Sequence, residues 1–427
     1  MSGRFSIFLC VLLAIPTGII AQQTSPPTVE DLVRTGLARN KSLLAIRERI
    51  AEAQGSLTQA GVRPSPVLEL KGATGKPLGT YGEEQYGAGF SQSIETFGKR
   101  SKRLQVATFG VAQAEAELQE GSAALAYEIR SAAAERRAEE QKLALLDEAA
   151  KVNAEAQRLT DARVHEGDVA PLEANLLRVE TNRALVLRRS AQARLTTAEL
   201  NLRRLSGLLQ SEALPSTTDV VPAASDLDSL KTKALQSRAD LRSARLQEEQ
   251  SQAGIQLARA NGKPDVDLSV GYSRQYSQFD DLFGQTPTGT LAPLHDRDDI
   301  LSFGISIPLR TSRSVKGEVQ AAIARTSGAR LRREYLERSI PLEVEGAYQR
   351  WTSATESIEL LRSGVVDPST SNLQVIREAY KLGQLRLLDV LNEQRRLVDT
   401  ELAFIDAQAD ATRSWAEIER AIGGNLP

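Results

Sequence analysis

Several residue types are scarce in this chain of 427 residues, and each scarcity excludes a class of function. The only cysteine is Cys10 and the only methionine is Met1, so the rest of the chain has no thiol or thioether for a disulfide or a soft-metal relay. Histidine is limited to His165 and His295, and no glycine-rich phosphate-binding motif occurs. We therefore expect no catalytic residues, no resident metal and no cofactor, and predict that the protein is not an enzyme.

One polar run could still hold an ion. The run HDRDD, His295 to Asp299, contains carboxylates that could bind a hard cation weakly. A solvated loop accounts for the same composition, and we favour that interpretation.

A dominant charge and a long apolar run are also missing. The chain has 53 Lys and Arg residues against 55 Asp and Glu residues, so it lacks the basic field that nucleic-acid binding needs. The N-terminus carries Arg4, the apolar run Ile7 to Ile20, and then Ala21, which predicts a signal peptide over residues 1–21 and export. Cys10 lies inside that run, so no lipidation is predicted. Beyond it, no apolar run reaches the ~20 residues of a membrane-spanning helix.

The clearest positive feature is an internal duplication. The segment from Leu32 to Gln54 recurs as the segment from Leu230 to Gln252, and Gly207 matches Gly423. We expect a first repeat over 22–215 and a second over 216–427, each with a helix, a β-hairpin and long helices.

Four segments alternate between apolar and polar residues, at 66–74, 84–94, 264–276 and 299–309. This period of two predicts hairpins over 66–94 and 264–309, with loops at Gly75 to Glu83 and at Ser277 to Asp298. A soluble sheet packed on helices would show the same pattern. Strand lengths of about 9–11 residues and polar-side charges such as Glu69, Lys71 and Asp267 favour transmembrane strands instead. The smallest transmembrane barrels have about eight strands, so several chains would have to share one barrel.

Long helices follow each hairpin, over 97–207 and 312–424. Apolar and small residues step by three and four from Lys99 to Glu166, which predicts one coiled-coil helix that ends at Gly167. In the second repeat we expect a kink at Pro341, an interruption at 365–369 and a turn at Gly383. An ordinary coiled-coil spacer would show the same heptads, but it would not carry hairpins at matching points of both repeats.

Three motifs suggest a family. They are FSQSIETFGKRSKR (90–103), VHEGDVAPLEANLLRVE (164–180) and YKLGQLRLLDVLNEQRRL (380–397). In this order the chain resembles the TolC-like outer membrane efflux proteins, especially the heavy-metal subgroup that serves pumps of the resistance-nodulation-division class. The resemblance implies an α+β membrane protein: a homotrimer with a 12-stranded barrel in the cell outer membrane and a 12-helix coiled-coil tunnel in the periplasm. It also implies a periplasmic membrane-fusion adaptor and an inner-membrane pump as partners, passive conduction of metal cations or drugs, contact with outer membrane lipid, and no nucleic acid.

The resemblance also implies functional residues. Asp389 matches the aspartate of the family's periplasmic gate by its spacing from Gly383, and the second gate position falls on Asn392. Glu173 is the corresponding acid of the first repeat, and Arg386 lies beside Leu385, where some members carry a gate-locking arginine. The residues expected to contact the adaptor lie in the two helical turns: Val164, Glu166, Gly167, Asp168, Leu382, Gly383 and Gln384.

Two other functions remain open from the sequence. The same architecture serves as the outer membrane duct of type I secretion. A periplasmic coiled-coil scaffold or adaptor, with its strands in a soluble domain, would also fit the helices.

Overall fold

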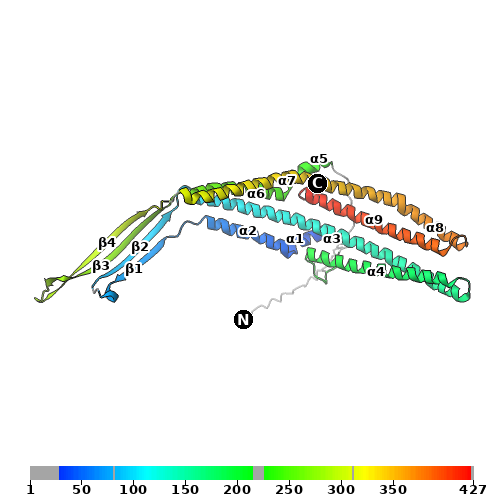
Figure 1. The fold of residues 1–427 in the computed structure, drawn as a ribbon, viewed down its shortest axis with the longest axis horizontal. Helices are drawn as coiled ribbons and strands as arrows, with labels where there is room; N and C mark the ends of the chain where they lie inside the picture. Colours follow the sequence, from blue (N-terminus) through cyan, green and yellow to red (C-terminus); the bar gives the residue numbers. More distant parts are fainter. Residues whose placement is uncertain (1–27, 80–81, 215–225, 310–311, 425–427) are drawn as a thin grey trace, which may run out of the picture.

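The computed structural model describes residues 28–79, 82–214, 226–309 and 312–424. The predicted signal peptide, residues 1–21, lies outside these ranges. The chain is elongated, with strands at one end, two helical turns at the other and long helices between them (Figure 1). None of the helices in the described part of the chain is both long and apolar enough to cross a bilayer.

The two repeats contain the same elements in the same order. The first has α1 (Val29–Arg39), α2 (Lys41–Ala60), β1 (Val67–Thr74), a 3-10 turn η1 (Lys76–Leu78), β2 (Glu84–Ile94), α3 (Lys99–Glu166) and α4 (Pro171–Ser206). The second has α5 (Leu227–Ser237), α6 (Ala239–Asn261), β3 (Val266–Gln285), β4 (Leu291–Ser306), α7 (Ser312–Leu361), a π-helical turn η2 (Arg362–Val366), α8 (Asp367–Lys381) and α9 (Leu387–Ala421).

Each repeat begins with two helices where the sequence pattern predicts one. The break falls at Asn40, which caps α2 by accepting hydrogen bonds from the Ser42 and Leu43 N–H groups at 2.9 and 3.2 Å. Its amide also donates to the Leu205 carbonyl at 2.9 Å, which ties the break to α4. Arg238 occupies the matching break between α5 and α6. Neither break contains a proline or glycine, so the sequence pattern did not predict the two breaks.

The four strands form one antiparallel sheet in the order β1-β2-β3-β4. The β2–β3 pairing therefore joins the hairpins of the two repeats, and no other described strand pairs with the outer edge of β1 or of β4. The predicted loop from Ser277 to Asp298 is wrong, because β3 continues to Gln285 and β4 begins at Leu291, with a bulge after Phe279. The apolar alternation stops in this region, but the backbone pairing continues, from Ser277 opposite Asp296 to Gln285 opposite Leu291.

The two faces of the sheet differ in polarity. Leu68, Phe90, Val270 and Phe303 lie side by side in register, one on each strand, and form part of an exposed apolar face. One position along, the residues in register on the opposite face are Glu69, Gly89, Gly271 and Ser302. The sheet thus has an apolar face that no other described element of the chain covers.

The helices lie beside one another as a layer. The 68-residue α3 is about 100 Å long at 1.5 Å per residue and runs through most of this layer. Near the sheet, α2, α3, α6 and α7 are successive neighbours; toward the far turns, α4, α3, α9 and α8 are. α7 continues through Pro341, and the predicted interruption at 365–369 takes the form of the π-helical turn at Arg362–Val366.

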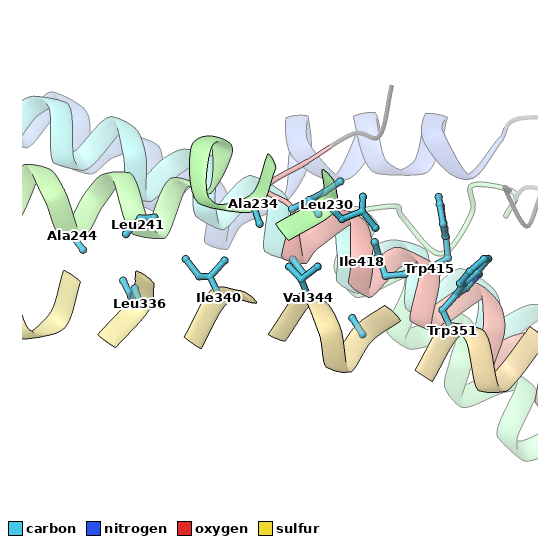
Figure 2. Close-up of a cluster of buried hydrophobic side chains, with 13 residues drawn as sticks. Leu230, Ala234, Leu241, Ala244, Leu336, Ile340, Val344, Trp351, Trp415 and Ile418 are labelled. Atoms are coloured by element: carbon cyan, nitrogen blue, oxygen red, sulfur yellow. The ribbon is translucent and has the colours of Figure 1, made fainter. Parts of the chain in front are cut away.

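The duplication also appears in the core. Figure 2 shows the second-repeat cluster, in which Ile340 of α7 packs with Leu230, Leu241 and Ile418 from three other helices. Leu32, Leu43, Ile129 and Leu202 form the equivalent cluster of the first repeat. At the end of the second cluster, the ring centroids of Trp351 and Trp415 lie 5.6 Å apart.

Candidate gate and contact surfaces

Two turns end the helical body. Gly167 and Gly383 have φ values of 84° and 73°, a left-handed conformation that glycine adopts at least cost. Both turns satisfy the last helical carbonyls in the same way: the Asp168 N–H donates to Arg163 at 3.0 Å, and the Gln384 N–H donates to Ala379 at 2.9 Å. Of the predicted contact residues, Glu166, Asp168, Leu382 and Gln384 are exposed at these turns, and Val164 is partly buried.

The two turns belong to one packed unit. Leu177 of α4 is buried against Leu387 and Leu391 of α9, and Tyr380 of α8 packs against the same cluster. This contact joins the helical hairpin of the first repeat to that of the second. The predicted gate residues therefore lie where the two hairpins meet.

A polar contact beside this cluster connects the same hairpins. The hydroxyl of Tyr380 lies near the side chains of Glu173 and Arg163, on α4 and α3, close enough for their charges to act on it. Burial raises the pKa of the Tyr380 hydroxyl, and the negative charge of Glu173 raises it further. We call these three side chains the tip latch. Of these three residues, only Glu173 was predicted from the sequence as a gate residue. Tyr380 and Arg163 were not predicted, although Tyr380 is the first residue of the motif at 380–397.

Asp389 is held differently. Its carboxylate accepts a hydrogen bond from the Arg386 backbone N–H at 3.1 Å, within the first turn of α9, and lies 3.8 Å from the Arg386 guanidinium. That guanidinium is largely exposed, so the ion pair adds little stability. The structure thus brings Asp389 and Arg386 together, leaves Asn392 exposed on α9, and places Glu173 with Tyr380 instead.

A second polar group lies further along the helices. The Gln394 amide donates to Asn153 at 2.8 Å, and Arg395 forms an ion pair with Glu180, so α9 is connected to both α3 and α4. These residues line a cavity of about 40 Å³, large enough for about two waters. No sequence signal distinguished these side chains from ordinary helical surface residues.

The HDRDD run is not a loop. It lies within β4, so alternation places His295, Arg297 and Asp299 on one face and Asp296 and Asp298 on the other. Asp299 also accepts a hydrogen bond from the Tyr272 hydroxyl at 2.6 Å. Among the described residues, no three His, Cys, Asp or Glu side chains converge as metal ligands.

The outer helices carry apolar stripes that stay exposed among the residues that the structure describes. On α4, Leu177, Ala184, Ala191 and Ala198 recur every seven residues and are buried. A second stripe, Leu172, Val179, Val186, Ala193 and Leu200, follows the same seven-residue spacing and is exposed, Val186 by 68%. α7 has exposed Leu331, Tyr335 and Leu342 on the other side of the layer. A helix with two heptad stripes is built to contact two neighbours.

A sheet with one apolar face, joined to a helical body about 100 Å long, is the architecture expected of a channel-type membrane protein. The chain belongs to the outer membrane efflux protein family, which matches residues 32–208 and 230–424, one match in each repeat. The resemblance inferred from the three motifs is therefore confirmed. Members of this family are channel proteins, so the prediction that the chain is not an enzyme is confirmed as well.

Individual relatives agree with this assignment. The chain is 23% identical over 411 residues to the cobalt-zinc-cadmium resistance protein CzcC of Cupriavidus metallidurans, covering 94% of this chain and 91% of that protein. Its fold resembles the solved structure of CusC, with a TM-score of 0.74, 19% identity and coverage of 93% and 92%. The outer membrane protein VceC of Vibrio cholerae is similar too, with a TM-score of 0.72, 21% identity and coverage of 93% and 96%.

Proposed function

We propose that this protein is the exit duct of a tripartite efflux system, a homotrimer in the cell outer membrane that extends into the periplasm. Conduction is passive, and an inner-membrane pump of the resistance-nodulation-division class supplies the energy through a periplasmic membrane-fusion adaptor. The observation that carries the proposal is the open four-stranded sheet, which has an uncovered apolar face and two free edges.

Closure of the sheet by three copies is geometrically consistent. Because neighbouring strands alternate in direction, β4 runs antiparallel to β1, and β1 of one copy can pair with β4 of the next without breaking the pattern. Three copies give twelve strands, more than the roughly eight needed for a barrel. Edge pairing also removes the exposed backbone donors and acceptors that hydrocarbon does not tolerate.

The apolar face has the dimensions of a lipid-facing band. Leu301, Phe303, Ile305, Ile307 and Leu309 recur at every second position and span roughly 26 Å along the chain. Asp299, two residues before Leu301 on β4, lies beside Arg274, so the apolar band ends there in a charged pair. Tyr86 and Tyr272 lie near this end of the band. Tyrosines at the rim of an apolar band are typical of a membrane interface. The remainder of β3 and β4 then extends into the external medium.

The helical layer supports the same assembly. Four helices lie side by side at each level, so three copies give a ring of twelve. The exposed stripes lie at opposite edges of the layer, where the edge of one copy meets the edge of the next. Burying them between copies removes apolar surface from water, at about 25 cal/mol per Å².

The helical turns form the periplasmic end of the duct. We assign adaptor contact to Val164, Glu166, Gly167, Asp168, Leu382, Gly383 and Gln384. Three Asp389 carboxylates around a narrow opening would attract cations and repel anions. The tip latch holds the two hairpins of each chain together, so its opening would widen the duct at this end.

Metal cations are the cargo that we favour. The full-length relative CzcC carries cobalt, zinc and cadmium resistance in its name, and a ring of Asp389 carboxylates suits a cation path. A strain lacking this protein should lose resistance to these cations while retaining resistance to organic drugs. The reverse pattern would assign the duct to drugs.

The decisive experiment measures location and conductance. Protein extracted from the outer membrane in detergent should be a trimer and should produce discrete conductance steps in planar bilayers. Asp389→Ala should lower cation selectivity, whereas Asp399→Ala, on an exposed part of α9, should not. Recovery as a soluble periplasmic monomer would support the scaffold function instead, and equal selectivity in both variants would reject the gate assignment.

A further inference from the structure

Cations gather where the sheet meets the helices. The Lys102 ammonium donates a hydrogen bond to the Phe97 carbonyl at 2.8 Å. The Lys263 ammonium lies 5.8 Å from the centroid of the Phe97 ring. Lys102 comes from α3 and Lys263 from the segment between α6 and β3, so the two repeats bring these charges to one aromatic residue.

Lys102 and Lys263 take no part in the ion pairs of this junction. Lys99 is paired with Asp265 at 2.7 Å, and Arg103 is paired with Glu95. Within the described part of the chain, neither Lys102 nor Lys263 has a carboxylate at ion-pair distance. Arg100 adds a third such charge, because its guanidinium donates to the Gly61 carbonyl at 2.7 Å rather than to an acid.

Helix stability does not explain this arrangement. The first turn of α3 contains Lys99, Arg100 and Lys102 and no acid. α2 and α7 also lack an acid there, whereas α1, α4, α5, α6, α8 and α9 each have one. The partial positive charge of a helix N-terminus favours acids there and disfavours cations. The cations therefore cost α3 some stability unless an anion from outside the chain offsets them.

Phe97 points to the nature of that anion. It is the one non-glycine residue with positive φ in the described ranges, at 54°, and 56% of it is exposed. Ile94 and Ile307, at the same end of the sheet, are also exposed. An exposed aromatic ring flanked by lysines at the end of an apolar band is typical of a membrane interface, where the ring lies among acyl chains and the ammonium groups reach the headgroups.

We propose that Phe97, Lys102 and Lys263 form a binding site for an anionic phospholipid of the periplasmic leaflet. The two ammonium groups bind the headgroup phosphate, and the Phe97 ring contacts the first part of the acyl chains. β2 and β3 are the inner strands of the sheet, so this site lies away from the edges that a second copy would cover. The inference rests on the proposed function, because it needs the sheet in a membrane.

The test uses the full-length protein, purified from the outer membrane in detergent. Phosphatidylglycerol, phosphatidylcholine and inorganic phosphate are added separately, and native mass spectrometry counts the molecules retained by the assembly. Wild-type protein should retain phosphatidylglycerol in preference to phosphatidylcholine. The variant Lys102→Gln/Lys263→Gln should retain it roughly 30-fold less well, since each cation near a lipid surface contributes about a fivefold preference.

Matched variants exclude simpler explanations. Lys151→Gln/Arg189→Gln removes two exposed cations from the long helices and should retain phosphatidylglycerol like the wild type. Lys263→Gln alone removes a side chain that makes no hydrogen bond to any described residue, so it tests the site even if loss of Lys102 disturbs the junction. It should weaken retention roughly fivefold, and Lys263→Arg should restore it.

Three results would overturn the inference. They are equal retention by the wild type and both Gln variants, equal retention of phosphatidylcholine, and full displacement of phosphatidylglycerol by inorganic phosphate at similar concentrations. If the same preparation still forms conducting trimers, the lipid site alone is wrong. If it forms no membrane channel, the proposed function is wrong as well.

Discussion

The buried ion pair between Lys99 and Asp265 should be one of the most sensitive points of the molecule. Only 7% of the Lys99 side chain is exposed, and its ammonium donates to Asp265 at 2.7 Å and to the Lys263 carbonyl at 2.8 Å. Asp265 also accepts from the Thr96 N–H at 3.0 Å. The pair therefore connects the β2–α3 junction of the first repeat with the α6–β3 junction of the second.

The variant Lys99→Met keeps the length of the side chain and removes its charge. Breaking a buried ion pair costs about 3–5 kcal/mol because the remaining charge is left without a partner. The Asp265 side chain is 28% exposed and keeps the Thr96 hydrogen bond, so we expect about 3 kcal/mol, at the lower end of this range. Asp265→Asn should cost a similar amount, and the double variant should cost less than the sum of the two, since neither charge is then left alone.

The pH dependence follows from the pKa of Asp265. Burial alone would raise this pKa, but the hydrogen bonds from Lys99 and Thr96 outweigh burial and hold it below its ordinary value. A depressed pKa in the folded state means that the pair stabilises the fold above the unfolded pKa of about 3.9. That stability is lost as the pH falls through the folded value. The difference between wild type and Lys99→Met should therefore shrink below about pH 4.

Thermal unfolding in detergent, followed by circular dichroism at neutral pH, measures the effect. Lys99→Met should lower the midpoint by several degrees. The control, Arg158→Met, breaks the exposed Arg158–Glu155 pair and should change the midpoint little, because exposed ion pairs contribute little to stability. If Lys99→Met lowers the midpoint no more than Arg158→Met does, or if the double variant shows full additivity, the pair does not stabilise the junction.

Three further predictions concern other regions. Tyr380→Phe removes the tip-latch hydroxyl and its polar interaction with Glu173 and Arg163, which should raise the open fraction in planar bilayers roughly fivefold; Tyr348→Phe should leave it unchanged. Val186→Glu places a charge on the exposed α4 stripe and should convert trimers to monomers in analytical ultracentrifugation, whereas Arg189→Glu should not. Ile340→Ala opens a cavity at a fully buried position and should destabilise the fold by about 2–5 kcal/mol in thermal unfolding, against little change for the exposed Ile323→Ala.

Each of these predictions has a contradicting outcome. An open fraction unchanged by Tyr380→Phe would mean that the tip latch does not hold the hairpins closed. A trimeric Val186→Glu protein would place the subunit contact elsewhere. If Ile340→Ala costs no more than Ile323→Ala, the cluster in Figure 2 does not dominate the stability of the second repeat.

The elements that sequence patterns predicted well are those with a long, uninterrupted period. α3 begins at Lys99 and ends at Glu166, as the heptads and Gly167 indicated, and β2 covers the predicted 84–94. In these segments one face is consistently apolar, so the period reports the surface that packs. The resemblance to the efflux family rested on motifs spread across both repeats, and it is confirmed.

The errors have a different origin. The outer halves of β3 and β4 were predicted as a loop because they lack apolar alternation; the backbone pairing that holds them, from Ser277 opposite Asp296 to Gln285 opposite Leu291, depends on the register. The breaks at Asn40 and Arg238 depend on contacts with Leu205 and Glu343, which are distant in the sequence. The tip latch likewise joins Tyr380 to Glu173 and Arg163 across three helices. A periodic pattern contains no information on such pairs.

The contact between the two tryptophans has a practical consequence. Trp351 and Trp415 are the only two tryptophans of the chain, and they come from α7 and α9, whose far ends lead to the second-repeat turn. Their tilted rings, 5.6 Å apart, are close enough for their excited states to couple, which adds a paired signal to the near-ultraviolet spectrum. Sliding of one helix along the other would change that signal without any added label. The protein therefore contains its own optical reporter of helix movement.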